Sequence, residues 1–267
     1  MSDYLSERIK PGKTGLSVGR LGLSAAYPAP TEALEAAFDS GCNYFYWGAL
    51  RRPPMTRAIR NIVARGEREN LVVVIQDFQR KPEPFEKSLM RGLKKGGLDY
   101  ADVLLLGWYN KPPNPATLDL TDKLRELGAF RYLGISGHKR TMFPEWAKDA
   151  RFDIFHVRYN AVNRGGDVDL FPHLPEERPG IVAFTTTKNG QLMKSGKIPK
   201  DEKKPTAGDC YRFALANPGI DVVITGASNA KQLEDNLAEV AKGPMDDEEM
   251  ARMRRVGDYV YGKERDY

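Results

Sequence analysis

Two side chains in the first quarter of the sequence have types and spacing that suit chemistry on a small polar molecule. Tyr46 ends a short apolar run, and Arg51 follows it in the next segment. A phenol can donate a proton, and a nearby guanidinium would lower the phenol's pKa and hold a carboxylate or oxyanion in a forked geometry. We expect both groups at one cavity floor. The alternative is that Tyr46 only packs in the cavity mouth while Arg51 points to solvent.

The histidines and cysteines indicate neither a metal site nor a disulfide. His138, His156 and His173 match no common ligand spacing, and no cysteine or carboxylate pair stands beside them. Cys42 and Cys210 are far apart and form no CxxC motif. We therefore expect no metal, hydrogen-bonded histidines, and a reducing compartment.

These candidate groups need a scaffold, and the sequence predicts alternating strands and helices. The predicted strands are Leu21–Ser24, Tyr44–Tyr46, Leu71–Gln76, Val103–Gly107, Tyr132–Ser136, Ile154–Arg158, Ile181–Thr185 and Val222–Thr225. The predicted helices are Thr31–Ser40, Met55–Arg65, Pro84–Lys95, Ala116–Leu127, Thr141–Lys148, a weak segment at Asp169–Leu174, Thr206–Asn217, Asn229–Ala241 and a last helix at Asp246–Asp258. Such alternation is typical of βαβ units, and this number of strands predicts an α/β protein with one (β/α)8 TIM barrel domain spanning residues 1–267. Residues that close the strands are then the functional candidates.

Several segments carry a specific resemblance. Those at 41–47, 68–75, 98–108 and 210–226 resemble the aldo-keto reductase family, and the similarity runs from Leu21 to Asn236. The resemblance implies a barrel of the aldo-keto reductase type that reduces carbonyl compounds with NADPH.

The family's four catalytic side chains are replaced in this chain. The resemblance places Tyr46 at the Asp position, Arg51 at the Tyr position, Gln76 at the Lys position and Gly107 at the His position. Gln76 and Gly107 cannot titrate, so the family mechanism cannot operate unchanged. We assign catalytic roles to Tyr46, Arg51 and Gln76, and substrate binding to Trp47, Trp108, Tyr109 and His138.

The resemblance also implies a dinucleotide groove that is only partly retained. His156 takes the place of a Gln that holds the nicotinamide amide, and a neutral imidazole can make that hydrogen bond. Phe184 offers a flat face for the ring, although core packing explains it almost as well. Gly226 and Gln232 replace the cations that grip the 2′-phosphate of NADP, so the cofactor is left as NAD or NADP. The predicted cofactor-binding residues are Ser136, His156, Phe184, Lys188, Ser228 and Asn236.

Three functions remain open at this point. The first is an oxidoreductase that uses a nicotinamide dinucleotide and protonates a bound carbonyl from Tyr46. The second is a lyase or isomerase acting on a small aromatic or anionic molecule. The third is a metabolite-binding protein without catalysis, which the fold alone does not exclude.

Composition restricts the partners. The chain has 267 residues, a net charge of +5 and a pI of about 9.0, but its Lys and Arg are scattered among acids. We therefore expect a small-molecule ligand and no nucleic acid. The amino terminus lacks an apolar core of signal-peptide length, and no stretch is apolar enough for a membrane span, so we expect a cytoplasmic protein.

Overall fold

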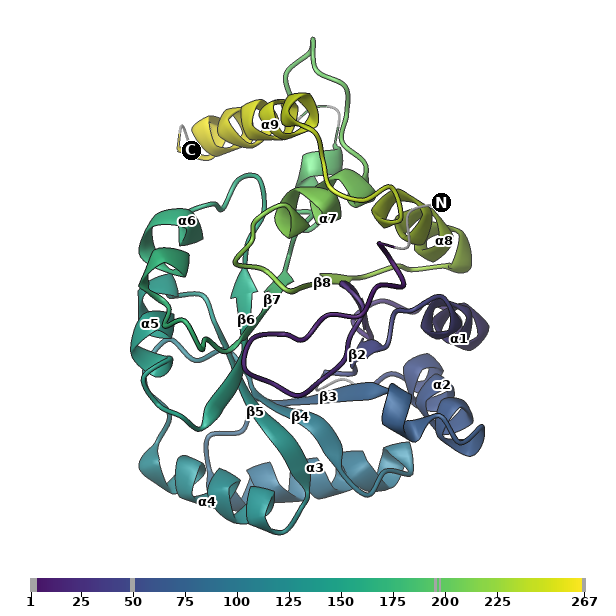
Figure 1. Ribbon diagram of the computed structural model, residues 1–267, viewed down its shortest axis with the longest axis vertical. Coiled ribbons are helices and arrows are strands. Elements are labelled where there is room, and N and C mark those ends of the chain that lie inside the picture. The colour runs from purple at the N-terminus through teal and green to yellow at the C-terminus, as the bar shows by residue number, and fades with distance from the viewer. Residues whose placement is uncertain (1–3, 49–50, 195, 197, 266–267) are drawn as a thin grey trace.

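The computed structural model describes residues 4–48, 51–194, 196 and 198–265. Within them, eight parallel strands close into a barrel in sequence order, surrounded by helices (Figure 1). The strands are β1 Leu21–Ser24, β2 Tyr44–Tyr46, β3 Val72–Asp77, β4 Ala101–Leu106, β5 Phe130–Gly137, β6 Phe152–Arg158, β7 Gly180–Phe184 and β8 Val222–Thr225. This confirms the predicted (β/α)8 barrel.

The helices alternate with the strands. They are α1 Thr31–Asp39, α2 Pro53–Ala64, α3 Pro82–Gly96, α4 Pro115–Glu126, α5 Phe143–Trp146, α6 Gly166–Asp169, α7 Ala207–Leu215, α8 Ala230–Val240 and α9 Asp247–Arg265. Single 3₁₀ turns lie at η1 Arg68–Asn70, η2 Arg140–Met142, η3 Phe171–His173 and η4 Gln191–Met193. The fifth and sixth helices are shorter than predicted. The start of the predicted fifth helix is the 3₁₀ turn η2, and the weak sixth segment is divided between α6 and η3. The last helix runs further than predicted.

Side chains alternate between the inside and the outside of the barrel wall. The inner cluster contains Tyr44, Val72, Val74 and Val103, and Tyr46 packs against it. Phe45 and Trp47 belong instead to the larger cluster between the strands and the helices. Successive residues of a strand point to opposite faces, so β2 sends Tyr46 inward and its two neighbours outward.

The amino-terminal segment closes one end of the barrel. Ile9 and Val18 pair in an antiparallel bridge, and Gly12 pairs with Pro179 at the start of β7. Leu16 and Val18 pack against the inner cluster at this end of the barrel. Figure 1 shows this segment crossing the barrel end that faces the viewer. The carboxyl ends of the strands are therefore the open rim.

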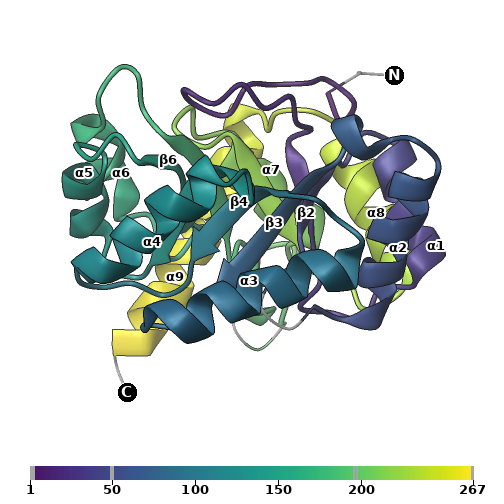
Figure 2. The same ribbon diagram turned by 90° about the horizontal axis from the view of Figure 1, so that it is seen from below.

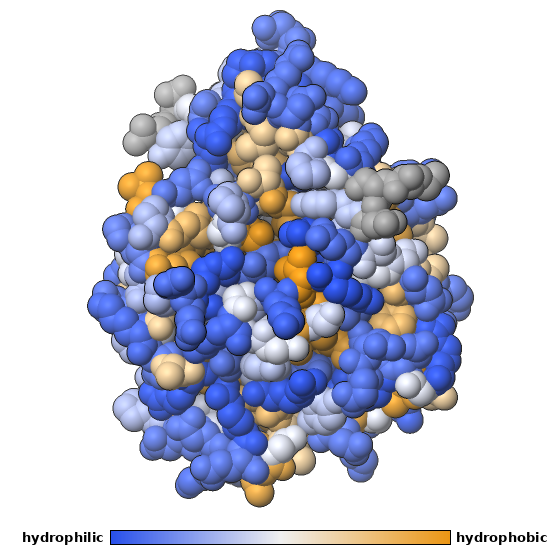
Figure 3. All heavy atoms as spheres, in the orientation of Figure 1, coloured by the Kyte–Doolittle hydropathy of each residue, from blue (hydrophilic) through white to orange (hydrophobic). Residues whose placement is uncertain are grey.

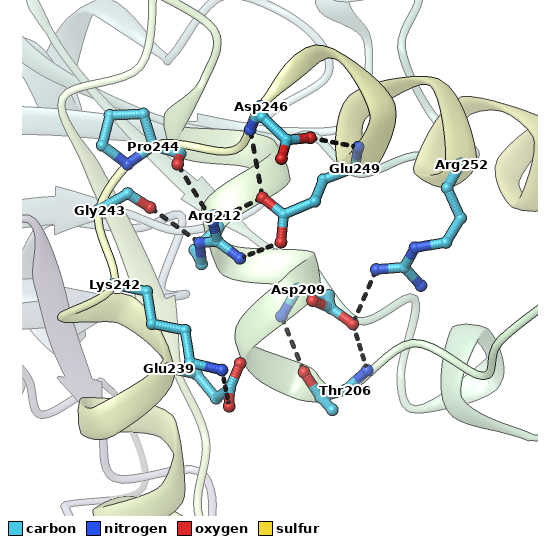
Figure 4. A network of polar contacts seen from close by, with 10 residues as sticks. All are labelled: Thr206, Asp209, Arg212, Glu239, Lys242, Gly243, Pro244, Asp246, Glu249 and Arg252. Atoms are coloured by element: carbon cyan, nitrogen blue, oxygen red, sulfur yellow. Dashed lines mark hydrogen bonds and ion pairs between the residues drawn. The ribbon is translucent and has the colours of Figure 1, made fainter.

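The carboxyl-terminal helix is held to the barrel by an ion-pair network (Figure 4). Arg212 of α7 pairs with both carboxylate oxygens of Glu249 of α9, each at 2.7 Å, and donates to backbone carbonyls at 243–244. Arg252 of α9 lies 3.1 Å from Asp209 of α7. The helix thus packs outside the barrel, as its sequence indicated.

The face in Figure 3 is mainly hydrophilic, with apolar areas that are small and separated. Among the described residues, no helix is long and apolar enough to cross a membrane.

Candidate functional site

A cavity of about 730 Å³ opens at the rim formed by the strand ends. Residues at or near the ends of seven strands line it: Ser24, Tyr46, Gln76, Ser136, His156, Phe184 and Ile224. This is where a barrel of this kind gathers its functional side chains. Sequence reasoning placed Tyr46, Gln76, Ser136, His156 and Phe184 here, and the structure brings all of them together.

A row of hydrogen bonds crosses the cavity floor. The Tyr46 hydroxyl donates to the Gln76 carbonyl oxygen. The Gln76 amide in turn donates to the Ser136 hydroxyl over 3.1 Å. Ser136 also accepts from the Trp108 backbone N–H at 3.0 Å and donates to the Leu106 carbonyl at 3.3 Å. Ser136 therefore links the floor to the loop after β4.

Burial keeps the floor uncharged. It raises the pKa of Tyr46 well above 10, with no cation among the causes. It also lowers the pKa of His156 to about 3, and the His156 Nε2 lies 2.8 Å from the Tyr44 hydroxyl. At neutral pH the phenol is protonated and the imidazole is neutral. None of the described lining residues is an Asp, Glu, Lys or Arg.

The expectation that Arg51 joins Tyr46 at the floor is wrong. Arg51 is buried outside the cavity, where its guanidinium donates to Ser88 of α3 at 3.1 Å and lies 3.9 Å from Asp77. The chain turns at Arg51 with a φ of 46°, and Gly92 of α3 leaves room for the side chain. Figure 2 shows α2 and α3 side by side on this flank. Because the guanidinium is directed there, it does not lower the pKa of Tyr46.

Two of the four predicted substrate-binding residues also lie elsewhere. Trp47 is fully buried between the barrel and α2, and its indole N–H donates to Thr56 at 3.2 Å. Tyr109 is buried with the Arg80 guanidinium over its ring at 4.0 Å. Trp108 and His138, in contrast, line the cavity mouth.

The far end of the cavity reaches the start of α8. Ser228, Gln232 and Asn236 line it. The Asn236 amide donates to the Thr225 hydroxyl at 2.9 Å, and the Ser228 backbone N–H donates to the Gln232 side-chain oxygen at 2.9 Å. Ser228 and Asn236 are two of the predicted cofactor-binding residues, and their role stays a prediction.

The loop after β7 forms one wall, but through other residues than predicted. Thr185, Thr186, Thr187, Asn189, Gly190 and Met193 line the cavity, whereas Lys188 does not. Thr185, Lys188 and Asn189 have left-handed φ values of 58°, 53° and 53°. No local sequence pattern predicts such irregular turning. Tyr27 and Tyr211 were missed as well, and both contribute rings to the wall.

The residues present fit a dinucleotide better than they fit a metal. The cavity is lined by aromatic side chains at Phe184 and Tyr211 and by hydroxyl and amide groups near the start of α8. Amide groups at a helix amino end favour phosphate. A β-carbon on Gly226 would lie 2.4 Å from the Tyr27 ring, so no side chain can extend there without moving Tyr27. Among the described residues, no cluster of three or more His, Cys, Asp or Glu could hold a metal ion.

Comparisons with known proteins agree with the fold. The family model described as the aldo/keto reductase family matches residues 20–209 and 194–258. The chain is 23% identical to L-galactose dehydrogenase of Arabidopsis thaliana, covering 86% of this chain and 87% of that protein. It is 24% identical to the NADH-specific methylglyoxal reductase of Escherichia coli (strain K12), over 45% of this chain and 37% of that protein. Among solved structures, it resembles the holo form of aldo-keto reductase AKR11C1 from Bacillus halodurans with a TM-score of 0.77 and 18% identity, covering 94% and 96% of the two chains.

Proposed function

The chain belongs to the aldo/keto reductase family, and from this we propose that it binds NAD or NADP in the rim cavity and reduces a small carbonyl compound there. The observation that carries the proposal is the Tyr46 hydroxyl, which is half-buried, protonated and located at the cavity floor. Characterised relatives in the family include oxidoreductases.

Five of the predicted residues are proposed to hold the dinucleotide. Phe184 offers a flat face and Ser136 and His156 offer polar atoms at the nicotinamide end, while Ser228 and Asn236 lie toward the α8 end. When bound, the dinucleotide supplies the hydride. The residues around Gly226 would select between NAD and NADP. The described lining residues include no cation that could bind a 2′-phosphate there.

Tyr46 would act as the proton donor. In the ligand-free floor its hydroxyl donates to Gln76, and a substrate carbonyl oxygen would take over that hydrogen bond. As negative charge develops on the oxygen, the phenol passes its proton on and is later reprotonated from solvent at the open mouth. The amide of Gln76, held by Ser136, keeps its carbonyl oxygen aimed at the phenol and so fixes the position of that donor.

The raised pKa of Tyr46 keeps the phenol in the protonated form that reduction requires. An alkoxide is a far stronger base than a phenolate, so transfer of the Tyr46 proton to it remains favourable. The reverse reaction needs a phenolate to take a proton from an alcohol, and burial without a nearby cation keeps the phenolate population very low.

The test measures cofactor binding and turnover separately. Calorimetry with NADH and NADPH should detect binding of at least one of them. Turnover of a carbonyl substrate with that dinucleotide should fall about 10²- to 10⁴-fold in Tyr46→Phe, with dinucleotide affinity unchanged. Absence of any dinucleotide binding, or full turnover in Tyr46→Phe, rejects the proposal.

A second candidate is ligand binding without catalysis. It is favoured by one observation, the lack of any charged side chain among the described lining residues. Dinucleotide binding with no turnover of any carbonyl would support this alternative. A lyase or isomerase acting through Arg51 loses its support, because that guanidinium lies outside the cavity.

A further inference from the structure

Three aromatic rings, those of Trp108, His138 and Phe184, line the cavity mouth, and a fourth, Phe78, packs behind Trp108. Phe78 packs on Trp108 with ring centroids 5.0 Å apart, Trp108 lies 6.3 Å from His138, and His138 lies 5.8 Å from Phe184. They come from the ends of β3, β4, β5 and β7. We call these four residues the aromatic shelf. Trp108 is 60% exposed and Phe78 is 39% exposed, and because the two rings are in contact they form one apolar surface beside the cavity, as binding sites often do.

The aromatic shelf is held in place by the backbone. Arg80 donates to the carbonyls of Phe78 at 2.8 Å, Gly107 at 2.7 Å and Trp108 at 3.2 Å. Trp108 has a φ of 55°, a conformation rare for a bulky residue. Such strain persists only where the surroundings fix it, and it is frequent at binding sites. These contacts hold the backbone from which the indole projects at the mouth.

The aromatic shelf is also tied to the proposed proton donor. The hydroxyl of Ser136 accepts from the Trp108 backbone and from Gln76, and Gln76 accepts from Tyr46. One serine thus sets the spacing between the shelf and the floor. Trp108 and Tyr46 line the same cavity, so a ring lying on Trp108 and a carbonyl at Tyr46 would share one space.

The electrostatics of the mouth disfavour an ionic ligand. The described lining residues carry no charged side chain, and burial together with nearby Arg158 lowers the pKa of His138. A carboxylate or ammonium entering here would lose water without gaining a charged partner among the described lining residues. An uncharged aromatic ring would instead gain stacking and apolar contact.

We propose that the substrate of this pocket is a flat, uncharged aromatic aldehyde or ketone whose ring lies on the aromatic shelf while its carbonyl reaches Tyr46. Its binding needs only the shelf, whereas its conversion rests on the reductase function proposed above. In that conversion the carbonyl carbon gains the hydride given up by the reduced dinucleotide, and the oxygen gains the Tyr46 proton. The product is the aryl alcohol, and solvent returns a proton to Tyr46.

Three aldehydes built on one skeleton test the proposal in the full-length protein by calorimetry without dinucleotide. They are 2-naphthaldehyde, its fully saturated decalin analogue, and 6-formyl-2-naphthoate. We expect 2-naphthaldehyde to bind about ten-fold more tightly than either of the others. Equal affinity for the saturated analogue, or tighter binding of the naphthoate, overturns the proposal.

Variants assign the effect to the aromatic shelf. Trp108→Ala should weaken 2-naphthaldehyde binding about ten-fold, and Trp108→Phe should retain most of the affinity. Leu127→Ala, which removes a 78% exposed apolar side chain at the end of α4, is the matched control and should change nothing. Unchanged affinity in Trp108→Ala, with its fold verified by circular dichroism, overturns the proposal.

Turnover separates this proposal from the reductase function. Selective binding of 2-naphthaldehyde without dinucleotide oxidation rejects the reductase and leaves the aromatic shelf supported. Equal turnover of the naphthyl and decalin aldehydes, unaffected by Trp108→Ala, rejects the shelf and supports the reductase.

Discussion

The ring of Phe78 fills the space that a side chain at Gly107 would need, since a β-carbon there would lie 2.4 Å from Phe78 and 2.9 Å from the Asp77 carbonyl oxygen. We predict that Gly107→Ala displaces the ring and destabilises the protein by about 1–3 kcal/mol through overpacking. Urea unfolding measures the loss of stability. Weaker binding of 2-naphthaldehyde would accompany it, because Phe78 supports Trp108.

Shrinking Phe78 provides the control for that prediction. Phe78→Ala should recover part of the stability lost in Gly107→Ala, since it frees the occupied space. The backbone contact to Asp77 would remain, so recovery should be incomplete. Two destabilisations that simply add in the double variant would show that the residues do not compete for space.

The protonation of Tyr46 predicts a flat pH profile. Its pKa lies well above 10 because of burial, so the rate of carbonyl reduction should not change between about pH 6 and about pH 9. Gln76→Lys would place an ammonium beside the phenol, which lowers the phenol's pKa by stabilising its anion. In that variant the rate should begin to fall at a lower pH than in the parent protein. Identical profiles for the two proteins would show that residue 76 does not act on Tyr46.

Because His156 is buried in its neutral form, we predict that the protein loses stability in acid. The pKa of His156 is about 3 in the folded protein and 6.5 when unperturbed, so below pH 6.5 the unfolded chain binds a proton that the native protein does not. The contribution of His156 is complete above pH 6.5 and is lost as the pH falls toward 3. Between pH 7 and pH 5 the loss should be about 2 kcal/mol.

His156→Gln isolates this contribution, because glutamine does not titrate and can still hydrogen-bond the Tyr44 hydroxyl. The difference in unfolding free energy between pH 7 and pH 5 should be smaller in this variant by about 2 kcal/mol. Urea titrations at both pH values measure it, and the comparison cancels the titration of other groups. If the pH dependence is the same in both proteins, protonation of His156 does not contribute to the loss of stability.

Residues closing regular strands were the predictable part of the site. Apolar runs located β2, β3, β5 and β7, and the alternation of a strand then directs Tyr46, Gln76 and Ser136 inward. The same alternation argues against Trp47 as a substrate contact, since it is the next residue after Tyr46. The family and the barrel fold were also legible, because they rest on segments distributed along the whole chain.

The unpredictable part depended on loop geometry and on contacts between distant segments. Arg51 leaves the cavity because its backbone turns with a positive φ and because Gly92, on another helix, makes room. The contribution of Phe78 requires the missing side chain at Gly107, a relationship between two loops that no local pattern contains. Lys188 does not line the cavity, and here too positive φ values are involved, since Thr185, Lys188 and Asn189 are all left-handed.

The ion pair between Arg212 and Glu249 should contribute to the stability with which α9 packs on the barrel. The Arg212 side chain is only 6% exposed, and hydrogen bonds from it hold the pKa of Glu249 below its usual value (Figure 4). Glu249→Gln removes the charge that compensates a buried guanidinium, so we predict a destabilisation of about 1–3 kcal/mol at neutral pH and faster hydrogen exchange in α9. The effect should shrink as the pH falls below the unperturbed value of 4.5, where the parent protein also loses this carboxylate.

The matched control is Glu83→Gln on α3, which removes a carboxylate from an exposed pair with Lys87. Exposed pairs of this spacing contribute about 0.5 kcal/mol or less, so this variant should unfold almost like the parent protein. The contact of α9 with η4, whose Met193 lines the cavity, adds a functional consequence. Loosening α9 should weaken ligand binding in Glu249→Gln but not in Glu83→Gln, and equal affinities in both variants would show that α9 does not support the cavity wall.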